Sequence, residues 1–197
     1  MKYLIIGMPR CRTAWLSTFL SSGSVNIGHE TFAEYKCKSF EDYYLIVNEY
    51  DLQGDSTTMM PFLHQIFEKD TERLCATPGM HVILVVRNVL DCLNASLNLM
   101  RTSSLPVTSD VKNNLLNRLR SDREWIEQWT VGYGQTVKLY DHNHLMDRIT
   151  LRDMYKDVTG RECNEAYLDK MMRLNIQREG GVLAYDTHYI RSLIDQN

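Results

Sequence analysis

The chain has 197 residues, of which 44% are hydrophobic and 24% are charged, which is enough for one domain with a substantial core. Its net charge of −3 gives no whole-molecule reason to expect binding to nucleic acid or to an acidic membrane, so any anion site has to be local. Five scattered cysteines without a CxxC pair indicate free thiols in a reducing compartment. We therefore expect a soluble cytoplasmic protein without a signal peptide or a membrane-spanning segment.

Short apolar runs alternate with helical patterns along the chain. Four runs are apolar or alternating and predict buried strands at 3–6, 25–27, 81–86 and 136–140. Helical spacing of apolar residues predicts helices at 13–20, 39–50, 59–69, 89–100, 111–129, 151–158 and 166–174. The polar stretch 51–58 separates two of these helices and is predicted to be a loop.

Strands that alternate with helices predict βα units and a mostly parallel sheet covered by helices on both faces. We therefore expect one three-layer α/β/α domain over residues 1–197. Sheets of this kind place their ligands at the carboxyl ends of the strands. Three polar clusters follow predicted strands at such ends: Pro9 to Thr13, His29-Glu30 and Arg87-Asn88.

The first cluster is a candidate anion site. A loop that enters a helix offers backbone N–H groups and the positive end of the helix dipole to an oxyanion. Arg10 and Arg12 add two guanidinium groups, and Thr13 adds a hydroxyl. The alternative is a surface turn with solvated arginines, but the position between a buried strand and a helix favours the anion site.

This loop does not match the Walker A motif GxxxxGK[ST]. Counted from Gly7, the second glycine, the lysine and the Ser/Thr of that motif fall on Arg12, Thr13 and Ala14. The mismatch disfavours an ordinary ATP- or GTP-dependent phosphotransferase.

The segment Pro9-Arg10-Cys11-Arg12-Thr13-Ala14-Trp15-Leu16 resembles the Pro-Lys/Arg-Ser-Gly-Thr-Thr-Trp-Leu loop of the sulfotransferases. Those enzymes have a P-loop NTPase-like α/β fold and use 3′-phosphoadenosine 5′-phosphosulfate (PAPS), which leaves as 3′-phosphoadenosine 5′-phosphate (PAP). The resemblance implies that Arg10 and Thr13 hold the 5′-phosphosulfate and that Trp15 lies near the adenine. Arg12 departs from the family glycine, and the helix position of Trp15 suits the core equally well. The residues implied in donor binding are Pro9, Arg10, Cys11, Arg12, Thr13, Ala14, Trp15, Arg87 and Ser96.

The cluster at Arg87 resembles a second sulfotransferase signature, Arg-Asn/Asp-Pro-x-Asp followed by a serine eight positions after the arginine. Arg87, Asn88 and Asp91 match it. By resemblance, Arg87 and Ser96 bind the 3′-phosphate of the donor. Ser96 stands nine positions after Arg87, and one residue rotates a helix by about 100°, so Asn94 is an alternative ligand. An Arg87–Asp91 salt bridge at i,i+4 is the structural alternative.

The cluster His29-Glu30 is the candidate for proton transfer. Sulfuryl transfer needs a base for the proton of the acceptor and cations for the departing phosphate. Several sulfotransferases, including the tyrosylprotein and trehalose types, place a glutamate just after the second strand, and Glu30 resembles it. His29 is the rival base, or else a hydrogen-bonded structural histidine. The resemblance thus implies Glu30, His29 and Arg10 as the catalytic residues.

Two further features of the sequence are weaker candidates for a functional site. His142 and His144 form a His-x-His without an evident third ligand, so we predict no metal site. Cys11 stands in a cationic, helix-N-terminal setting, which predicts a lowered thiol pKa. A cysteine-phosphatase loop would need Cys-x5-Arg, and position 17 is serine.

The sequence therefore favours an enzyme, a PAPS-dependent sulfotransferase that acts on a hydroxyl or amine. Its partners would be the small-molecule nucleotide donor and an acceptor that the sequence does not identify, with no nucleic acid and no membrane. The sequence leaves the oligomeric state open. The alternatives are a P-loop-like nucleotide-dependent kinase or phosphotransferase, and a non-catalytic nucleotide-binding relative, which the position of Ser96 and the substitution at Arg12 support.

Overall fold

The computed structural model describes residues 1–132 and 136–174, with side chains described outside 129–136. A five-stranded parallel sheet forms its centre, in the order β2-β3-β1-β4-β5. The strands are β1 (Tyr3–Gly7), β2 (Ile27–His29), β3 (Gly54–Thr57), β4 (His81–Val86) and β5 (Thr136–Asp141). This confirms the predicted α/β class with a parallel sheet. The single domain over 1–197 stays a prediction, because it includes residues outside the described ranges.

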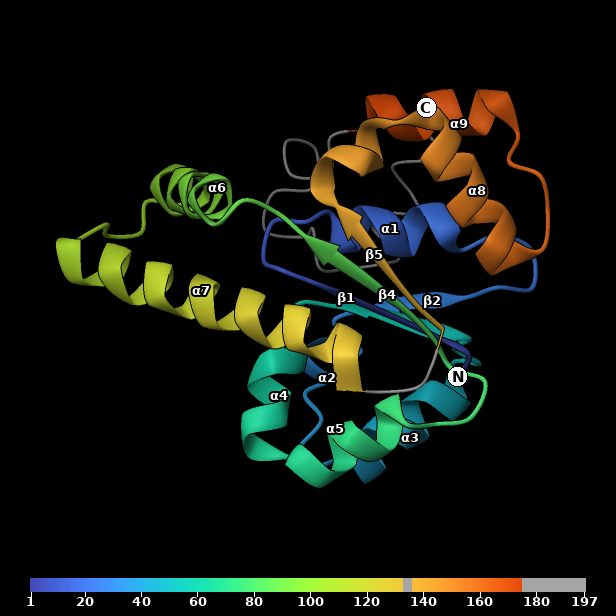
Figure 1. Ribbon diagram of the computed structural model, residues 1–197, viewed down its shortest axis with the longest axis horizontal. Helices are drawn as coiled ribbons and strands as arrows, with labels where there is room; N and C mark the ends of the chain where they lie inside the picture. The colour runs from blue at the N-terminus through green and yellow to red at the C-terminus, as the bar shows by residue number, and fades with distance from the viewer. Residues whose placement is uncertain (133–135, 175–197) are drawn as a thin grey trace.

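Helices cover both faces of the sheet (Figure 1). Helices α1, α8 and α9 lie on one face, and α2 to α5 with α7 lie on the other, while α6 extends from the carboxyl end of β4 and packs on α7. The bounds are α1 (Thr13–Leu20), α2 (Thr31–Glu34), α3 (Phe40–Glu49), α4 (Met60–Ile66), α5 (Glu68–Cys75), α6 (Val89–Thr102), α7 (Ser109–Gly132), α8 (Arg148–Thr159) and α9 (Glu165–Arg173), with a 3₁₀ turn η1 (His142–Met146).

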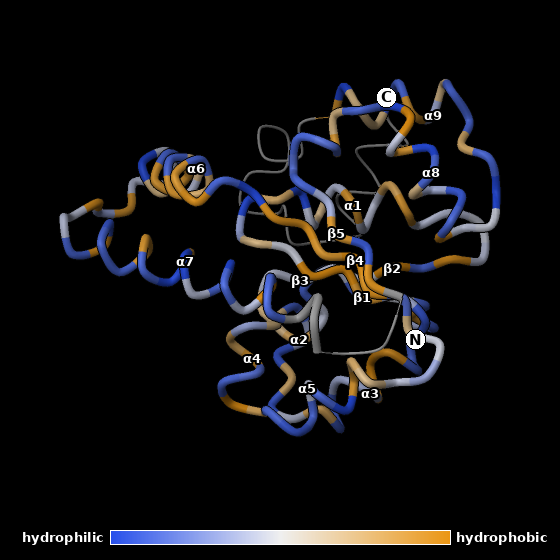
Figure 2. Tube along the Cα trace, in the orientation of Figure 1, coloured by the Kyte–Doolittle hydropathy of each residue, from blue (hydrophilic) through white to orange (hydrophobic). Residues whose placement is uncertain are grey.

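The core is centred on β1 and β4, which are the most apolar segments of the chain (Figure 2). Leu4, Ile5 and Ile6 have no exposed surface, and residues 82–86 of β4 are all buried. Strands covered by helices on both faces lose the polar–apolar alternation of half-exposed strands. This is why their positions were predictable from hydrophobicity alone.

The prediction of a loop over residues 51–58 was wrong. Gly54-Asp55-Ser56-Thr57 forms β3, a fully buried strand between β2 and β1. Its polar side chains are satisfied by tertiary contacts: Ser56 Oγ donates to the Thr13 carbonyl at 2.9 Å, and Thr57 Oγ1 donates to Glu30 Oε2 at 2.6 Å. Buried polar groups with partners carry little penalty, so a strand without apolar residues is stable here and gives no hydrophobic signal.

Other helix and strand boundaries differ less from the predicted ones. The second strand is Ile27–His29 rather than 25–27, so Glu30 follows it directly. The predicted helix at 59–69 is two helices, α4 and α5, which meet at Phe67 in a non-helical conformation (φ −127°, ψ 51°), and α5 continues to Cys75. The spacing of apolar residues in the sequence did not predict the short helix α2 or the turn η1.

Gly54 tests the placement of β3. A Cβ at this position would come within 2.7 Å of the Tyr3 carbonyl oxygen and 2.8 Å of Ile27 Cδ1, so both neighbouring strands would have to move. We expect Gly54→Ala to lower the free energy of unfolding by about 1–3 kcal/mol, measured as a lower urea midpoint at unchanged slope. Gly79→Ala, whose Cβ has open space but whose φ is +76°, should cost only backbone strain. Unchanged stability of Gly54→Ala would contradict the strand order.

Candidate active site

The β1–α1 loop (residues 8–12) turns back tightly over the end of β1. A Cβ on Gly7 would stand 2.8 Å from Thr13 Cγ2, so glycine permits this close return. Met8 N–H donates to the Val85 carbonyl and Cys11 N–H to the Met8 carbonyl, both at 3.1 Å. These bonds fix the loop against β4 and leave the first N–H groups of α1, which have no intrahelical acceptors, at the carboxyl edge of the sheet.

Arg10 and Arg12 both adopt the left-handed conformation, with φ of 70° and 65°. Non-glycine residues adopt it at a cost of about 1–2 kcal/mol, and a chain segment that alternates into this region forms an anion-binding concavity of backbone N–H groups. Arg12 stands where the sulfotransferase loop has glycine, and it takes the conformation that glycine adopts freely. The substitution therefore keeps the shape of the loop at a local energetic cost.

The Arg12 side chain ties the loop to the far edge of the sheet. Its Nη1 donates to the Leu145 carbonyl of η1 at 3.1 Å, and its Cζ lies 5.2 Å from the centre of the Trp15 ring. Burial and the charge of Arg87 lower its pKa from the ordinary value, although an arginine remains charged in proteins. Arg12 thus acts as a bridge between the loop and the segment after β5.

Arg87 follows β4 and meets the loop from the neighbouring strand. Its Nη1 donates to the Arg10 carbonyl at 3.0 Å. Within residues 1–132 and 136–174, neither Arg12 nor Arg87 forms an ion pair with a carboxylate, so the Arg87–Asp91 alternative is not realised. Burial and the charges of Arg87 and Arg12 lower the pKa of His142 to about 4, and the charges of Asp141 and Asp91 oppose this shift only in part. The cluster is therefore electropositive.

His29 and Glu30 interact with different parts of the site. His29 is buried, and its Nε2 lies 3.3 Å from Thr13 Oγ1 at the start of α1. Glu30 has a positive φ of 50°, and its carboxylate accepts hydrogen bonds from Thr57 Oγ1 at 2.6 Å and from Thr58 N and Oγ1 at 2.7 Å each. His29 is thus next to the β1–α1 loop, whereas Glu30 is bound to the end of β3.

A buried carboxyl group that sequence reasoning missed lies beside Glu30. Asp55 of β3 is buried and accepts hydrogen bonds from Thr31 Oγ1 at 2.8 Å and Thr31 N at 3.3 Å, and from Tyr43 OH at 3.4 Å. Burial raises its pKa to about 7, the charge of Glu30 also raises it, and the bonds from Thr31 and Tyr43 oppose the rise. The available signal was the polar run 54–58, which was predicted to be a loop.

The remaining residues that the sequence predicts to bind the donor differ in burial. Trp15 is 3% exposed, donates from Nε1 to the Met171 carbonyl at 2.8 Å and stacks on Phe19 at 4.8 Å, which matches its core alternative. Ser96 is half-buried on α6, and Asn94 is exposed. Pro9 and Ala14 are half-buried at the loop.

The predicted lowering of the Cys11 pKa was wrong in direction. A hydrogen bond with the Cys92 thiol and complete burial raise the pKa of Cys11, and the charge of Arg87 opposes them only in part. A helix N-terminus lowers a thiol pKa only where the thiolate is solvated or directly paired. Cys11 is therefore a buried protonated thiol.

His142 and His144 lie in η1, where His144 Nδ1 accepts from the Asp141 N–H at 3.3 Å. No group of three His, Cys, Asp or Glu side chains that could hold a metal ion occurs among the described residues. None of the described helices is long and apolar enough to cross a membrane.

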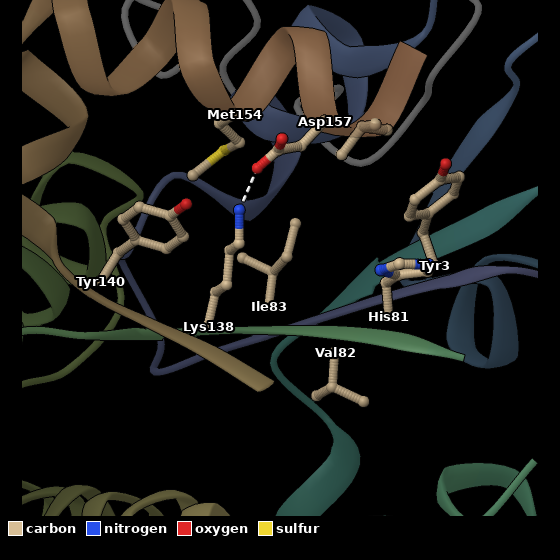
Figure 3. Close-up of a pocket in the computed structure, with 9 residues that line it drawn as sticks. Tyr3, His81, Val82, Ile83, Lys138, Tyr140, Met154 and Asp157 are labelled. Carbon is tan, nitrogen blue, oxygen red and sulfur yellow. Dashed lines mark hydrogen bonds and ion pairs between the residues drawn. The ribbon is translucent and has the colours of Figure 1, made fainter. Parts of the chain in front are cut away.

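A hollow of about 160 Å³ lies between α8 and the sheet (Figure 3). It begins at Tyr3 and His81, the first residues of β1 and β4, and runs along β5 past Lys138, which forms an ion pair with Asp157 of α8. The β1–α1 loop and Arg87 lie at the opposite ends of β1 and β4. No residue of the arginine cluster lines the hollow, whose lining extends along β5 as far as Tyr140, opposite Val85 of β4.

Two solved structures have the same fold over almost the whole chain. A sulfotransferase from Alicyclobacillus acidocaldarius matches 98% of this chain and 95% of its own length, with a TM-score of 0.59 and 13% identity. The sulfotransferase domain from the curacin biosynthetic pathway matches 99% of this chain and 89% of its own length, with a TM-score of 0.57 and 13% identity. No protein-family model matches the chain, and neither does any curated protein sequence. The chain therefore has the sulfotransferase fold.

Proposed function

We propose that this chain is a sulfotransferase that moves a sulfuryl group from PAPS to a hydroxyl or amine acceptor. The observation that carries the proposal is the arginine cluster at the carboxyl ends of β1 and β4. Arg87 contacts the backbone of the β1–α1 loop at Arg10, so a 5′-phosphosulfate on the loop and a 3′-phosphate on Arg87 would occupy one continuous electropositive surface. Arginine forks suit such oxyanions.

In the proposed reaction, the acceptor oxygen or nitrogen attacks the sulfur and forms a new bond as the bond from sulfur to the 5′-phosphate oxygen breaks. The acceptor proton passes to a base, and PAP departs with the electron pair. Arg10 and the first N–H groups of α1 would stabilise the charge that develops on the departing phosphate. Thr13 would hold the sulfuryl oxygens through its hydroxyl.

We assign the role of the base that takes the acceptor proton to His29, with Glu30 as the alternative. His29 Nε2 lies 3.3 Å from Thr13 Oγ1, and Thr13 is the residue that would hold the sulfuryl group. The Glu30 oxygens already accept three hydrogen bonds from Thr57 and Thr58. In this assignment Glu30 fixes the turn between β2 and α2 and so positions His29.

The two assignments of the base predict different effects of substitution at His29 and Glu30. His29→Asn should keep PAP binding and lower turnover by about 10²–10⁴-fold, the usual contribution of a general base. Glu30→Gln should lower turnover less and lower stability, since the amide nitrogen cannot accept the bonds from Thr57 or Thr58. Steady-state kinetics with each variant, together with its thermal midpoint, separate the two. A full loss of turnover at normal stability in Glu30→Gln would make Glu30 the base.

A non-catalytic nucleotide-binding protein is the second candidate, because the Glu30 carboxylate already accepts three hydrogen bonds and His29 is buried. A thermal-shift panel with PAP, ATP, GTP and AMP tests the donor first, since a ligand that binds only the folded state raises the midpoint. We expect the largest shift with PAP. Stabilisation by ATP without stabilisation by PAP would overturn the sulfotransferase proposal, and PAP binding without transfer to any hydroxyl or amine would favour the second candidate.

A further inference from the structure

The hollow between α8 and the sheet has a volume of about 160 Å³ and an apolar interior (Figure 3). Ile83 of β4 lines it from the sheet, and Met154 and Val158 line it from α8; all three side chains are buried. An apolar cavity of about 150 Å³ takes up benzene. The hollow therefore has room for a ligand with one six-membered ring.

Aromatic side chains stand at both ends of this hollow. Tyr3 of β1 and His81 of β4 are partners in register, and the centroids of their rings lie 5.5 Å apart. Tyr140 lies at the other end and extends from β5 on the same side as Lys138 (Figure 3). Tyrosine rings pack against other rings and attract cations to their faces. These side chains suit a ligand that is aromatic and positively charged.

Two carboxylates act on one ammonium beside the hollow. Lys138 pairs with Asp157, and Asp153 stands one turn before Asp157 on the same side of α8. A hydrogen bond to Asp157 raises the pKa of Lys138, and the charges of both aspartates add to the rise. Burial raises the pKa of Tyr140, and the same two charges add to it. The local field therefore favours a cation over an anion.

We propose that this hollow is a binding site for a small aromatic amine, with the ring between Ile83 and Met154 and the ammonium on Asp157. The carboxylate of Asp157 binds Lys138 through Oδ2, and a carboxylate accepts from more than one donor. An aromatic carboxylate would suit the site less, because Asp153 and Asp157 would repel it.

The ion pair at the hollow is open to exchange with a ligand. The side chains of Lys138 and Asp157 are 46% and 49% exposed, and exposed ion pairs contribute little to stability. A ligand ammonium can therefore share or take over the Asp157 carboxylate without loss of the fold. For the same reason, substitutions at these two positions are expected to leave the chain folded.

The test is an NMR titration of the full chain, labelled with ¹³C at the methionine methyl groups. The probes are benzylamine, which is an ammonium at neutral pH, and two molecules of similar size, benzyl alcohol and benzoate. We expect benzylamine to shift the Met154 methyl signal to saturation, and to bind at least severalfold more tightly than the other two. The signal is assigned by its loss in Met154→Leu. The readout needs no nucleotide, so the result stands apart from the proposed function.

Substitutions of the ion pair should act in opposite directions. Asp157→Asn is expected to weaken benzylamine binding by about 10-fold, the size of one charge-assisted hydrogen bond. Lys138→Gln is expected to strengthen it severalfold, because the competing ammonium is gone. Lys156→Gln is the matched control: Lys156 is an exposed lysine of α8 that pairs with Glu162 and does not line the hollow, so binding should stay nearly unchanged.

Equal or tighter binding of benzyl alcohol or benzoate would overturn the proposal. So would the reverse effects of Asp157→Asn and Lys138→Gln, or a saturable shift at other methionine methyl groups without one at Met154. A titration in which benzylamine produces no saturable shift would also overturn it.

Discussion

Replacement of Arg87 with alanine is expected to weaken PAP binding by about 10- to 100-fold, the size of one or two lost charge-assisted hydrogen bonds. Under the proposed function, Arg87 would bind the 3′-phosphate, and it also donates from Nη1 to the Arg10 carbonyl. The variant should therefore lose most of its affinity for PAP and a smaller part of its affinity for 5′-AMP. Calorimetric titration of both nucleotides measures the two losses.

Arg101→Ala is the matched control for this prediction. Arg101 is an exposed arginine near the end of α6, where it bonds to Asn98. Its removal should leave both affinities unchanged. Equal losses of PAP and 5′-AMP affinity in Arg87→Ala would mean that Arg87 only supports the β1–α1 loop, and no loss of either would remove it from the donor site.

Asp55→Asn is expected to change how stability depends on pH. The pKa of Asp55 is about 7 in the folded chain, against about 3.9 for an ordinary aspartate. Between these values the folded chain keeps a proton that the unfolded chain releases, so stability is highest below about pH 4 with respect to this group and falls as pH rises towards 7. At about 1.4 kcal/mol per unit, the total effect is at most about 4 kcal/mol. In Asp55→Asn this decline of stability with rising pH should be absent.

The free energy of unfolding from urea titrations at pH 5, 6, 7 and 8 checks the prediction. Asparagine keeps an oxygen to accept from Thr31, so the variant should fold and should be at least as stable as the wild type at pH 8. Asp51→Asn replaces an exposed carboxylate that bonds to Gln53, and it should reproduce the wild-type pH profile. A wild-type profile in Asp55→Asn would show that Asp55 is not the titrating group.

The strands that could be predicted from the sequence are those made almost entirely of apolar residues. β1 and β4 are continuous apolar runs because helices cover both of their faces. β3 could not be found in this way, because its four buried residues are one glycine and three polar side chains, of which Asp55 is held by Thr31 and Tyr43 from outside the strand. Such partners are known only once the tertiary structure is known.

The candidate active site was likewise predictable only in part. Because parallel strands end at one edge of the sheet, the sequence could predict that Arg10 and Arg87 lie together. It could not predict that Arg12 turns to the Leu145 carbonyl, which comes from η1 more than 130 residues away. Nor could it predict the partners of Glu30, Thr57 and Thr58, which lie at the end of β3, where the sequence predicts a loop.

The structure of the chain with bound PAP tests the central proposal most directly. We expect the 5′-phosphate at the backbone N–H groups of the β1–α1 loop, with Thr13 and His29 on the side where the sulfuryl group would stand. The 3′-phosphate should lie on Arg87. PAP bound elsewhere, for example in the hollow between α8 and the sheet, or PAP with its 3′-phosphate away from Arg87, would contradict the account.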